Sequence, residues 1–261
     1  MRGDEDLALV EIARREVRRF FKYKWWTTGI ILMNLSDMVI LGLIYNGIVN
    51  AKYTPYYFKF LAPGITAMAA FISAFSIGRE TALEIITGYN DYLRSLPIGD
   101  FTLAFGKIIA GSLRGIIYSF PFLTLTFIIV SEFNFMKILE ALITIFIITL
   151  AMSSLGIAIA PLVKKLSIYT ALRSLLYYVI YFFGTIYYPK NAIMEVARNN
   201  KVYFIVYLIG EVNPVSKGAE IIRSILNIST INLWDIVSFL ISSLTTILIG
   251  SLVYVEEIRS K

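Results

Sequence analysis

The sequence of 261 residues contains no cysteine and no histidine. Disulfide bonds, thiol nucleophiles, zinc sites built on these residues and imidazole acid–base catalysis are therefore excluded from this chain. A loop of the form Gly-x-x-x-x-Gly-Lys-Ser/Thr, which holds ATP phosphates, is also missing. The pair Gly106-Lys107 is followed by Ile108, and Phe101 stands where that loop needs its first glycine.

Charged residues are scarce as well, at 16% of the chain, whereas a soluble domain carries about 25%. Hydrophobic residues make up 57% and are gathered into long runs. A helix of about 20 apolar residues crosses a bilayer, and six runs reach or approach that length. The runs are Thr27–Ile48, Phe60–Ile77, Ile108–Val130, Ala141–Val163, Ser174–Tyr188 and Ile236–Val255. The fifth is short, and it reaches full length only with Arg173 and the residues before it. The sequence predicts an all-α membrane protein with six transmembrane helices in a single domain, 1–261.

The distribution of basic residues predicts the orientation. Six spans place both termini on one side, and most of the lysines and arginines lie on that side, chiefly in the N-terminal arm. Positive charge favours the cytoplasmic side of a membrane. We therefore expect cytoplasmic N- and C-termini in a multi-pass protein of the plasma membrane.

The N-terminal arm, residues 1–26, has two faces when it is drawn as a helix. Apolar side chains recur on one face, at Val10, Ala13, Val17 and Phe20. Glutamate and basic side chains recur on the opposite face, at Glu11, Arg15, Arg18 and Lys22. The pattern is typical of an amphipathic helix that lies in the membrane surface. The alternative is a solvated leader that only enforces the orientation.

A polar insert between the second and third runs shows the same kind of pattern. Apolar positions recur at Ala82, Ile86, Tyr89, Leu93 and Leu96, and polar ones at Glu80, Glu84, Thr87, Asp91 and Arg94. These spacings predict a two-faced helix over 79–96. Gly88 weakens it at the middle, so a bend or a second short helix can start there, and Pro97 stops it. Either the helix packs on its own protein at the interface, or it offers one face to a soluble partner.

The residues of this insert resemble a known signature. Gly88-Tyr89-Asn90-Asp91-Tyr92-Leu93-Arg94-Ser95-Leu96-Pro97-Ile98, followed by Gly106-Lys107, resembles the cytoplasmic segment of type-2 ABC-transporter permeases. Tyr89, Asn90 and Arg94 depart from the family pattern. Asn213-Pro214, followed by Glu220-x-x-Arg223, is similar to an element that the family carries outside, between its fifth and sixth spans.

The resemblance implies the membrane subunit of an ABC exporter with the six-helix, type V exporter fold. Two separate ATPase subunits would bind ATP and magnesium, so this chain needs no cofactor of its own, and a second permease copy, identical or similar, would complete the pathway. The N-terminal helix corresponds to the family's connecting helix, and residues 78–107 to its coupling region. The residues assigned to ATPase coupling are Glu84, Gly88, Tyr89, Asp91, Tyr92, Leu93, Ser95, Leu96, Pro97, Gly106 and Lys107.

Residues 189–231 form a long, partly apolar segment that we expect on the extracellular side. Its apolar stretch Val202–Ile209 is too short to span, which favours re-entrant or surface helices. By resemblance, such helices line the exit of the pathway, and Asn213 and Pro214 are assigned to an outer gate.

Two features inside the predicted spans are candidates for a substrate pathway. Asp37 falls near the centre of the first span, where an ionisable group is costly and marks a functional site by default. A structural role, with a hydrogen bond to Asn34, Ser36 or Arg114, is the alternative. Tyr177, Tyr181 and Tyr188 share one face of the fifth span, where they either pack or contact substrate.

Taken together, the sequence predicts a permease for amphipathic cargo: a lipid, a lipid-linked glycan, a drug or a peptide. The bilayer and the ATPases are the expected surroundings, and no nucleic acid is expected. A secondary transporter or channel would show inverted repeats and paired broken helices, which are not clear here. An intramembrane enzyme would need a convergent catalytic group, for which the residues are few.

Overall fold

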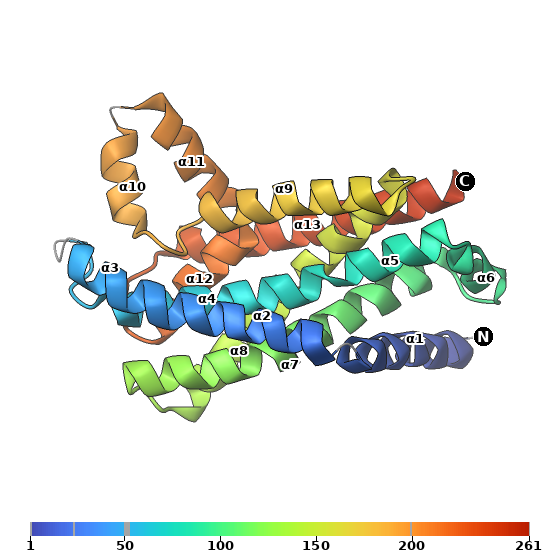
Figure 1. Ribbon diagram of the computed structural model, residues 1–261, viewed down its shortest axis with the longest axis horizontal. Coiled ribbons are helices and arrows are strands. Elements are labelled where there is room, and N and C mark those ends of the chain that lie inside the picture. The colour runs from blue at the N-terminus through green and yellow to red at the C-terminus, as the bar shows by residue number, and fades with distance from the viewer. Residues whose placement is uncertain (1, 23, 50–52, 199, 261) are drawn as a thin grey trace.

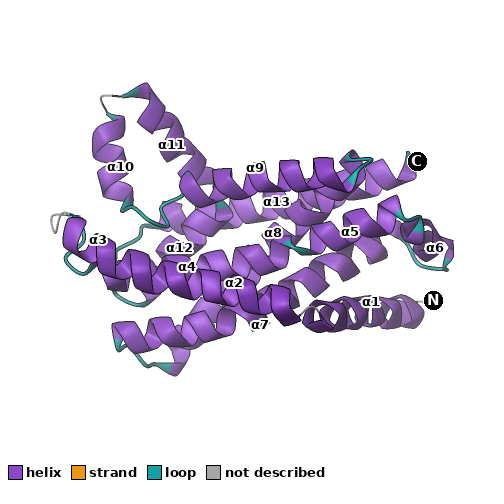
Figure 2. Cartoon of the chain, in the orientation of Figure 1, coloured by secondary structure: helices purple, strands orange, loops and turns teal. Residues whose placement is uncertain are grey.

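The computed structural model describes residues 2–22, 24–49, 53–198 and 200–260, which form helices joined by loops and turns and contain no strand (Figures 1 and 2). The α-helices are α1 (Arg2–Lys22), α2 (Lys24–Ser36), α3 (Gly42–Ile48), α4 (Tyr57–Phe75), α5 (Ile77–Ile86), α6 (Tyr89–Ser95), α7 (Asp100–Val130), α8 (Phe135–Ile159), α9 (Leu166–Phe182), α10 (Lys190–Ala197), α11 (Lys201–Val212), α12 (Pro214–Ile225) and α13 (Leu233–Arg259). A π-helical turn, η1 (Asp37–Leu41), joins α2 to α3, and a 3₁₀ turn, η2 (Ala160–Leu162), follows α8.

Five segments of the described chain are long and apolar enough to cross a membrane. They are Ile31–Ile48, Tyr57–Ile86, Asp100–Val130, Phe135–Leu162 and Leu233–Arg259. They contain the first, second, third, fourth and sixth predicted spans or most of them. The α9 helix has only 17 residues and rises about 26 Å, less than the roughly 30 Å of a hydrocarbon core. The count of six spans therefore stays a prediction.

The helix of the fifth run includes Arg173 and the residues before it, as the shortness of the run requires, because α9 begins at Leu166. Its predicted end at Tyr188 is wrong, because α9 ends at Phe182. The chain leaves helical geometry at Phe183, and the residues from Gly184 to Tyr187 are buried without being helical. Buried non-helical backbone at this depth needs hydrogen-bond partners from the rest of the protein.

Helices α12 and α4 supply those partners. Arg223 of α12 donates to the carbonyl oxygens of Thr185 at 2.8 Å and Ile186 at 2.9 Å. The hydroxyl of Tyr57 donates to the carbonyl of Tyr187 at 2.7 Å. The side chain of Arg223 is 1% exposed, so α12 lies inside the bundle and not on its surface. The break in the fifth apolar run is stabilised by a helix that the sequence placed in an extracellular loop.

The centre of the bundle is α4, in which every residue from Phe60 to Phe75 is buried. It packs against α7, α8 and α12. Small residues allow the helices to approach closely: a Cβ at Gly156 of α8 would lie 2.7 Å from the carbonyl oxygen of Phe75.

The bundle has two distinct ends (Figure 1). The terminal end carries α1, α6 and both ends of the described chain. The hairpin end carries α3 and the pair α10–α11, which projects away from the other helices. The described residues therefore leave both termini on one side of the bundle, as an even number of spans requires.

The N-terminal arm is helical as predicted, and one side of it packs on the bundle. Ile12, Ala13 and Glu16 are 7%, 6% and 1% exposed, whereas Val10 is 57% exposed. Arg114 of α7 pairs with Glu16, and Ile12 packs against Gly106, whose missing side chain leaves room for it. The placement of the apolar face in the membrane surface stays a prediction. The side chain of Phe20, which the sequence placed on the apolar face, lies outside the described residues.

The polar insert bends where it was predicted to. Gly88 has a left-handed backbone, with φ of 75°, between α5 and α6, and α6 ends at Ser95 before Pro97. The predicted faces are wrong in part. Glu80 and Glu84 are buried, because α1 and α7 pair with them, while Ile86 at the end of α5 and Leu96 just after α6 are exposed.

Candidate functional site

A cluster of buried ion pairs joins α1, α5 and α7 at the terminal end. We call it the terminal cluster, and it consists of Arg15, Glu16, Arg19, Glu80, Glu84, Lys107 and Arg114. Its members come from segments far apart in the sequence. The cluster therefore holds the N-terminal helix against the start of the third span.

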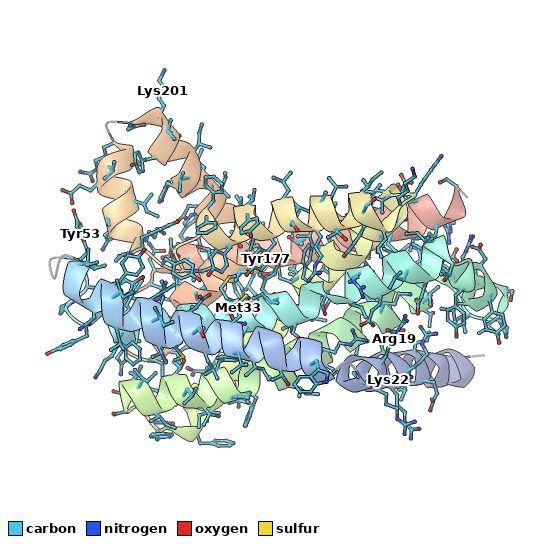
Figure 3. The ribbon with its side chains drawn as sticks, in the orientation of Figure 1. Arg19, Lys22, Met33, Tyr53, Tyr177 and Lys201 are labelled. Carbon is cyan, nitrogen blue, oxygen red and sulfur yellow. The ribbon has the colours of Figure 1, made fainter. Side chains whose placement is uncertain are left out.

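Glu84 is the centre of one half of the cluster. Its Oε2 accepts from the ammonium of Lys107, and its Oε1 accepts from Arg15 and Arg19 at 3.0 Å each. Glu84 and Lys107 have side chains that are 3% and 1% exposed. Arg19 extends from α1 toward α5 (Figure 3). A carboxylate buried this deeply is stabilised only because three cations surround it.

Arg114 is the centre of the other half, and its side chain is 0% exposed. It donates to Oε2 of Glu80 at 2.7 Å, to Oε2 of Glu16 at 3.2 Å, and to the main-chain oxygen of Glu16. Burial raises the pKa of Glu16, but the cations Lys107, Arg15 and Arg114 outweigh it and lower that pKa to about 2. Glu16 is therefore ionised at neutral pH and fixes α1 to the bundle.

The residues assigned to ATPase coupling all lie at the terminal end but at two depths. Glu84, Leu93, Gly106 and Lys107 are buried. Those that are exposed lie on or beside α6, and are Gly88, Tyr89, Asp91, Tyr92, Ser95, Leu96 and Pro97. The first group positions the second, because Leu93 packs with Ile12 and Leu103 beneath the exposed surface.

Asn90, which departs from the family pattern, has a clear structural partner. It is 2% exposed, and its Oδ1 accepts from the hydroxyl of Tyr254 at 3.0 Å. Tyr254 lies on α13 and is fully buried. The contact ties α6 to the last helix, so that α6 is attached to α13 and, through Leu93, to α1 and α7.

A groove of about 450 Å³ opens between α1 and α5 next to α6. Arg15, Arg19, Glu84 and Tyr89 are among its lining residues. Arg15 donates to the Tyr89 hydroxyl at 3.2 Å, and its guanidinium carbon lies 5.3 Å from the centre of that ring. The rim of the groove is thus basic and aromatic.

Three of the four candidate pathway residues, Asp37, Tyr177 and Tyr181, are brought together, and Tyr177 lies about midway along the bundle (Figure 3). The Tyr181 hydroxyl donates to Oδ2 of Asp37 at 2.8 Å, and the ring of Tyr177 stacks on that of Tyr181 at 5.4 Å. Tyr188 lies further along and donates to the main-chain oxygen of Phe182. The partner of Asp37 is therefore on α9.

Asp37 also begins the π-helical turn η1. Such turns widen a helix by one residue and occur frequently at functional sites. Arg114, one of the partners considered for Asp37, pairs with Glu16 and Glu80. Asn34, another of them, donates to the hydroxyl of Tyr118 at 3.3 Å.

A second cluster of ion pairs lies at the hairpin end. We call it the hairpin cluster, and it consists of Lys190, Glu211, Lys217, Glu220 and Asp235. Lys217 is 0% exposed and lies 2.8 Å from Glu211, 3.0 Å from Asp235 and 3.4 Å from Glu220. The cluster joins α10, α11, α12 and α13.

Asn213 and Pro214, the residues assigned to a gate, form the N-terminus of α12. The Asn213 side chain accepts from the main-chain nitrogen of Val215 at 3.0 Å and donates to the carbonyl of Ile180 at 3.0 Å. Asn213 thus caps α12 and attaches it to the end of α9, and Pro214 takes the first helical position that suits a proline.

Sequence reasoning missed Glu16, the pairing of Glu80 with Arg114, and the ion pairs of the hairpin cluster, of whose members it had singled out only Glu220. Arg114 was the available signal, because an arginine inside an apolar run requires carboxylates or carbonyls around it. No group of three or more His, Cys, Asp or Glu side chains in the described residues could hold a metal ion. The ion pairs of both clusters join helices that are far apart in the sequence.

The helices that are long and apolar enough to cross a membrane agree with one comparison with known proteins. Among curated proteins the chain finds no sequence match. Residues 8–227 match the model of a family described as ABC-2 type transporter. Because the match covers most of the chain, this multi-pass membrane protein belongs to the ABC-2 type transporter family, whose members are permeases of ABC transporters.

Proposed function

We propose that the chain is the membrane-spanning permease subunit of an ATP-driven exporter. It forms the pathway with a second permease copy, identical or similar, and two separate ATPase subunits dock at the terminal end, which faces the cytoplasm in the plasma membrane. ATP and magnesium bind to those subunits. Family membership supports the permease role, and the arrangement of α6 supports the docking site.

The observation that carries the proposal is the surface of α6. Tyr89, Tyr92 and Leu96 are 41%, 58% and 37% exposed, and the two tyrosine rings lie 5.7 Å apart. Two adjacent exposed aromatic rings offer a protein partner a large contact area. Tyrosine, with its large amphipathic ring, is enriched at the centres of protein interfaces.

The attachment of α6 allows force to reach the bundle. Leu93 contacts α1 and α7, and Asn90 holds Tyr254 of α13. Beneath them, Glu84 binds Lys107 of α7. A displacement of α6 by a docked ATPase therefore moves the start of the third span, the end of the last span and the N-terminal helix together.

The cargo is amphipathic in this proposal. Asp37 and Tyr181 offer hydrogen-bonding groups beside the stacked rings of Tyr177 and Tyr181, midway along the bundle. Such a surface suits a molecule with polar and apolar parts. Tyr188 continues the path toward the hairpin end, where Asn213 and Pro214 take part in the outer gate.

The test is a double substitution, Tyr89→Ala with Tyr92→Ala, in the affinity-tagged chain expressed in its native membrane. We expect an ATPase to co-purify with the unchanged chain in equal amount and to be lost from the variant. Tyr203→Ala is the matched control, because Tyr203 is 47% exposed but lies at the hairpin end. An undiminished ATPase in the double variant would disprove docking at α6.

The second candidate is an ATP-independent secondary transporter or channel. The broken fifth span, with its buried non-helical residues from Gly184 to Tyr187, is the observation that favours it, because transporters of that class use broken helices. Purified chain in liposomes without any ATPase distinguishes the two. Uphill movement of solute driven by an ion gradient would replace the exporter by this candidate.

A further inference from the structure

A polar cavity of about 140 Å³ lies at the hairpin end, between the start of α10, α12 and the segment that precedes α13. Charged and hydroxyl side chains dominate its lining, including Thr54, Lys190, Glu220, Arg223, Thr230 and Asp235. None of the functions proposed above uses it. Its volume is several times that of one water molecule, so the cavity can hold a small polar group.

The charged side chains around the cavity are occupied by hydrogen bonds, with one exception. Oδ1 of Asp235 accepts from Lys190 and Lys217, and its Oδ2 accepts from the main chain of Asn232. Arg223 donates through all three of its nitrogens to backbone carbonyls of Phe60, Thr185 and Ile186. These groups form a fixed frame.

Glu220 is the exception. Its side chain is 9% exposed, and Oε1 is buried without a hydrogen-bond partner. Its other oxygen has only a long contact, 3.4 Å from the ammonium of Lys217. A buried carboxylate oxygen without a partner carries a desolvation cost that a donor in the cavity removes. A ligand that donates a hydrogen bond to Glu220 would therefore suit the cavity.

The charges around the cavity decide what kind of donor fits. Lys190, Lys217 and Arg223 are balanced by three carboxylates, those of Glu211, Glu220 and Asp235. An ammonium or a phosphate group would add an unpaired charge to a buried, balanced set, which is costly. A neutral hydroxyl group donates to Glu220 without that cost.

An apolar groove of about 440 Å³ lies on the other side of the first turn of α10. It is lined by Phe182, Tyr188, Ile193, Val196 and Tyr203, among others. The cavity is lined by Pro189, Lys190 and Asn191, and the groove by the residues on either side of them, Tyr188 and Ala192. A polar site and an apolar site are thus separated by a single helical turn.

We propose that the cavity binds a neutral, hydroxyl-bearing headgroup, such as a sugar or polyol, of an amphipathic molecule whose apolar part lies in the groove. Glu220 accepts a hydrogen bond from a headgroup hydroxyl, and Thr54 and Thr230 surround it. The inference deepens the proposed function, on which it rests, by naming the class of cargo that reaches the hairpin end.

The test measures binding to the purified chain in detergent micelles, without any ATPase, by native mass spectrometry. The probe is dioctanoylglycerol glucoside, compared with dioctanoyl phosphatidylethanolamine and dioctanoyl phosphatidylcholine at equal concentrations. We expect the glucoside to bind best. Glu220→Gln should weaken its binding about tenfold, because a charge-assisted hydrogen bond is lost.

A second variant covers the case in which Glu220→Gln disturbs Lys217 and the fold. Asn191 is exposed and lines the cavity outside the ion pairs, so Asn191→Phe should fill the opening and abolish binding while the helices stay in place. Glu132→Gln is the control, because Glu132 lies at the same end but outside the cavity. It should bind the glucoside like the unchanged chain.

Two results would overturn the inference. Equal binding of the glucoside by the unchanged chain, Glu220→Gln and Asn191→Phe would place the ligand elsewhere. Preferred binding of the ethanolamine lipid, lost in both variants, would keep the site but refute the neutral headgroup. Because no ATPase is present, loss of co-purifying ATPase from α6 variants tests the proposed function separately.

Discussion

The two ends of the bundle neutralise a buried charge with opposite arrangements of anions and cations. At the terminal end a carboxylate, Glu84, is surrounded by three cations, two of which are about one-third exposed: Arg15 at 32% and Arg19 at 31%. At the hairpin end a lysine, Lys217, is surrounded by three carboxylates and is 0% exposed. The first arrangement leaves positive charge at the surface, and the second is closed.

This difference shows what each cluster can do. The terminal cluster fixes a peripheral helix, α1, and keeps a basic rim beside the exposed tyrosines of α6. It remains open to a partner. The hairpin cluster fixes short helices around the broken end of α9, where unsatisfied backbone would be costly, and it encloses a cavity. The terminal end is suited to contact with a partner, and the hairpin end holds an irregular backbone in place.

Removal of one cation from each cluster should separate the two ends most strongly. Lys217→Met leaves three carboxylates facing one another with only Lys190 beside them, and should lower the free energy of unfolding by about 3–5 kcal/mol. Arg19→Met should cost clearly less, because Arg19 is 31% exposed and Glu84 keeps Lys107 and Arg15 as partners. Thermal unfolding of both variants in detergent measures the difference. Equal losses would contradict the open and closed description.

Acid should act on the terminal end through Glu16. Its pKa is lowered from an ordinary 4.5 to about 2, so its contribution to stability is complete above about pH 4.5 and is lost as the pH falls toward 2. The loss is on the order of 3 kcal/mol. Unfolding measured from pH 6 to pH 2 should show it, and Glu16→Gln should flatten the profile. The exposed Glu11→Gln serves as the control, and a flat profile in the unchanged chain would refute the ion-pair assignment.

The smallest effect is expected at the turn that sets the direction of α6. A Cβ at Gly88 meets nothing within 4 Å, so Gly88→Ala costs only the left-handed backbone, about 1 kcal/mol. Gly99→Ala is the matched control, because Gly99 has an ordinary extended backbone with φ of −69°. The coupling of ATP hydrolysis to transport should fall in Gly88→Ala and not in Gly99→Ala. No difference between them would show that the angle of α6 is unimportant.

Local features of the sequence predicted local features of the fold well. Gly88 and Pro97 mark the bend and the end of the coupling segment, because each acts through the backbone of its own neighbourhood. The apolar runs predicted most of the spans for the same reason. The end of the fifth span was placed wrongly. Its helix stops before Phe183, because the backbone beyond that residue is held by Arg223, about forty residues later in the sequence.

The candidate sites were predicted unevenly. Tyr181 and Asp37 were both singled out, but their hydrogen bond was not foreseen, because it joins helices 144 residues apart in the sequence. The burial of Glu80 and Glu84 was also missed. Helical periodicity assigns charged residues to solvent, and it cannot tell that another helix carries the opposite charges that allow burial.

The sequence by itself determined that this is a helical membrane protein, where its chain bends at the coupling segment and which family it belongs to. It did so because hydrophobic run length, glycine and proline act over short distances. The tertiary structure alone decided which charges are buried, that α1 is fixed through Glu16 and Arg114, and that α12 satisfies the broken end of α9. Those outcomes depend on the positions of side chains from distant segments, and only the packed helices bring such groups within hydrogen-bonding distance.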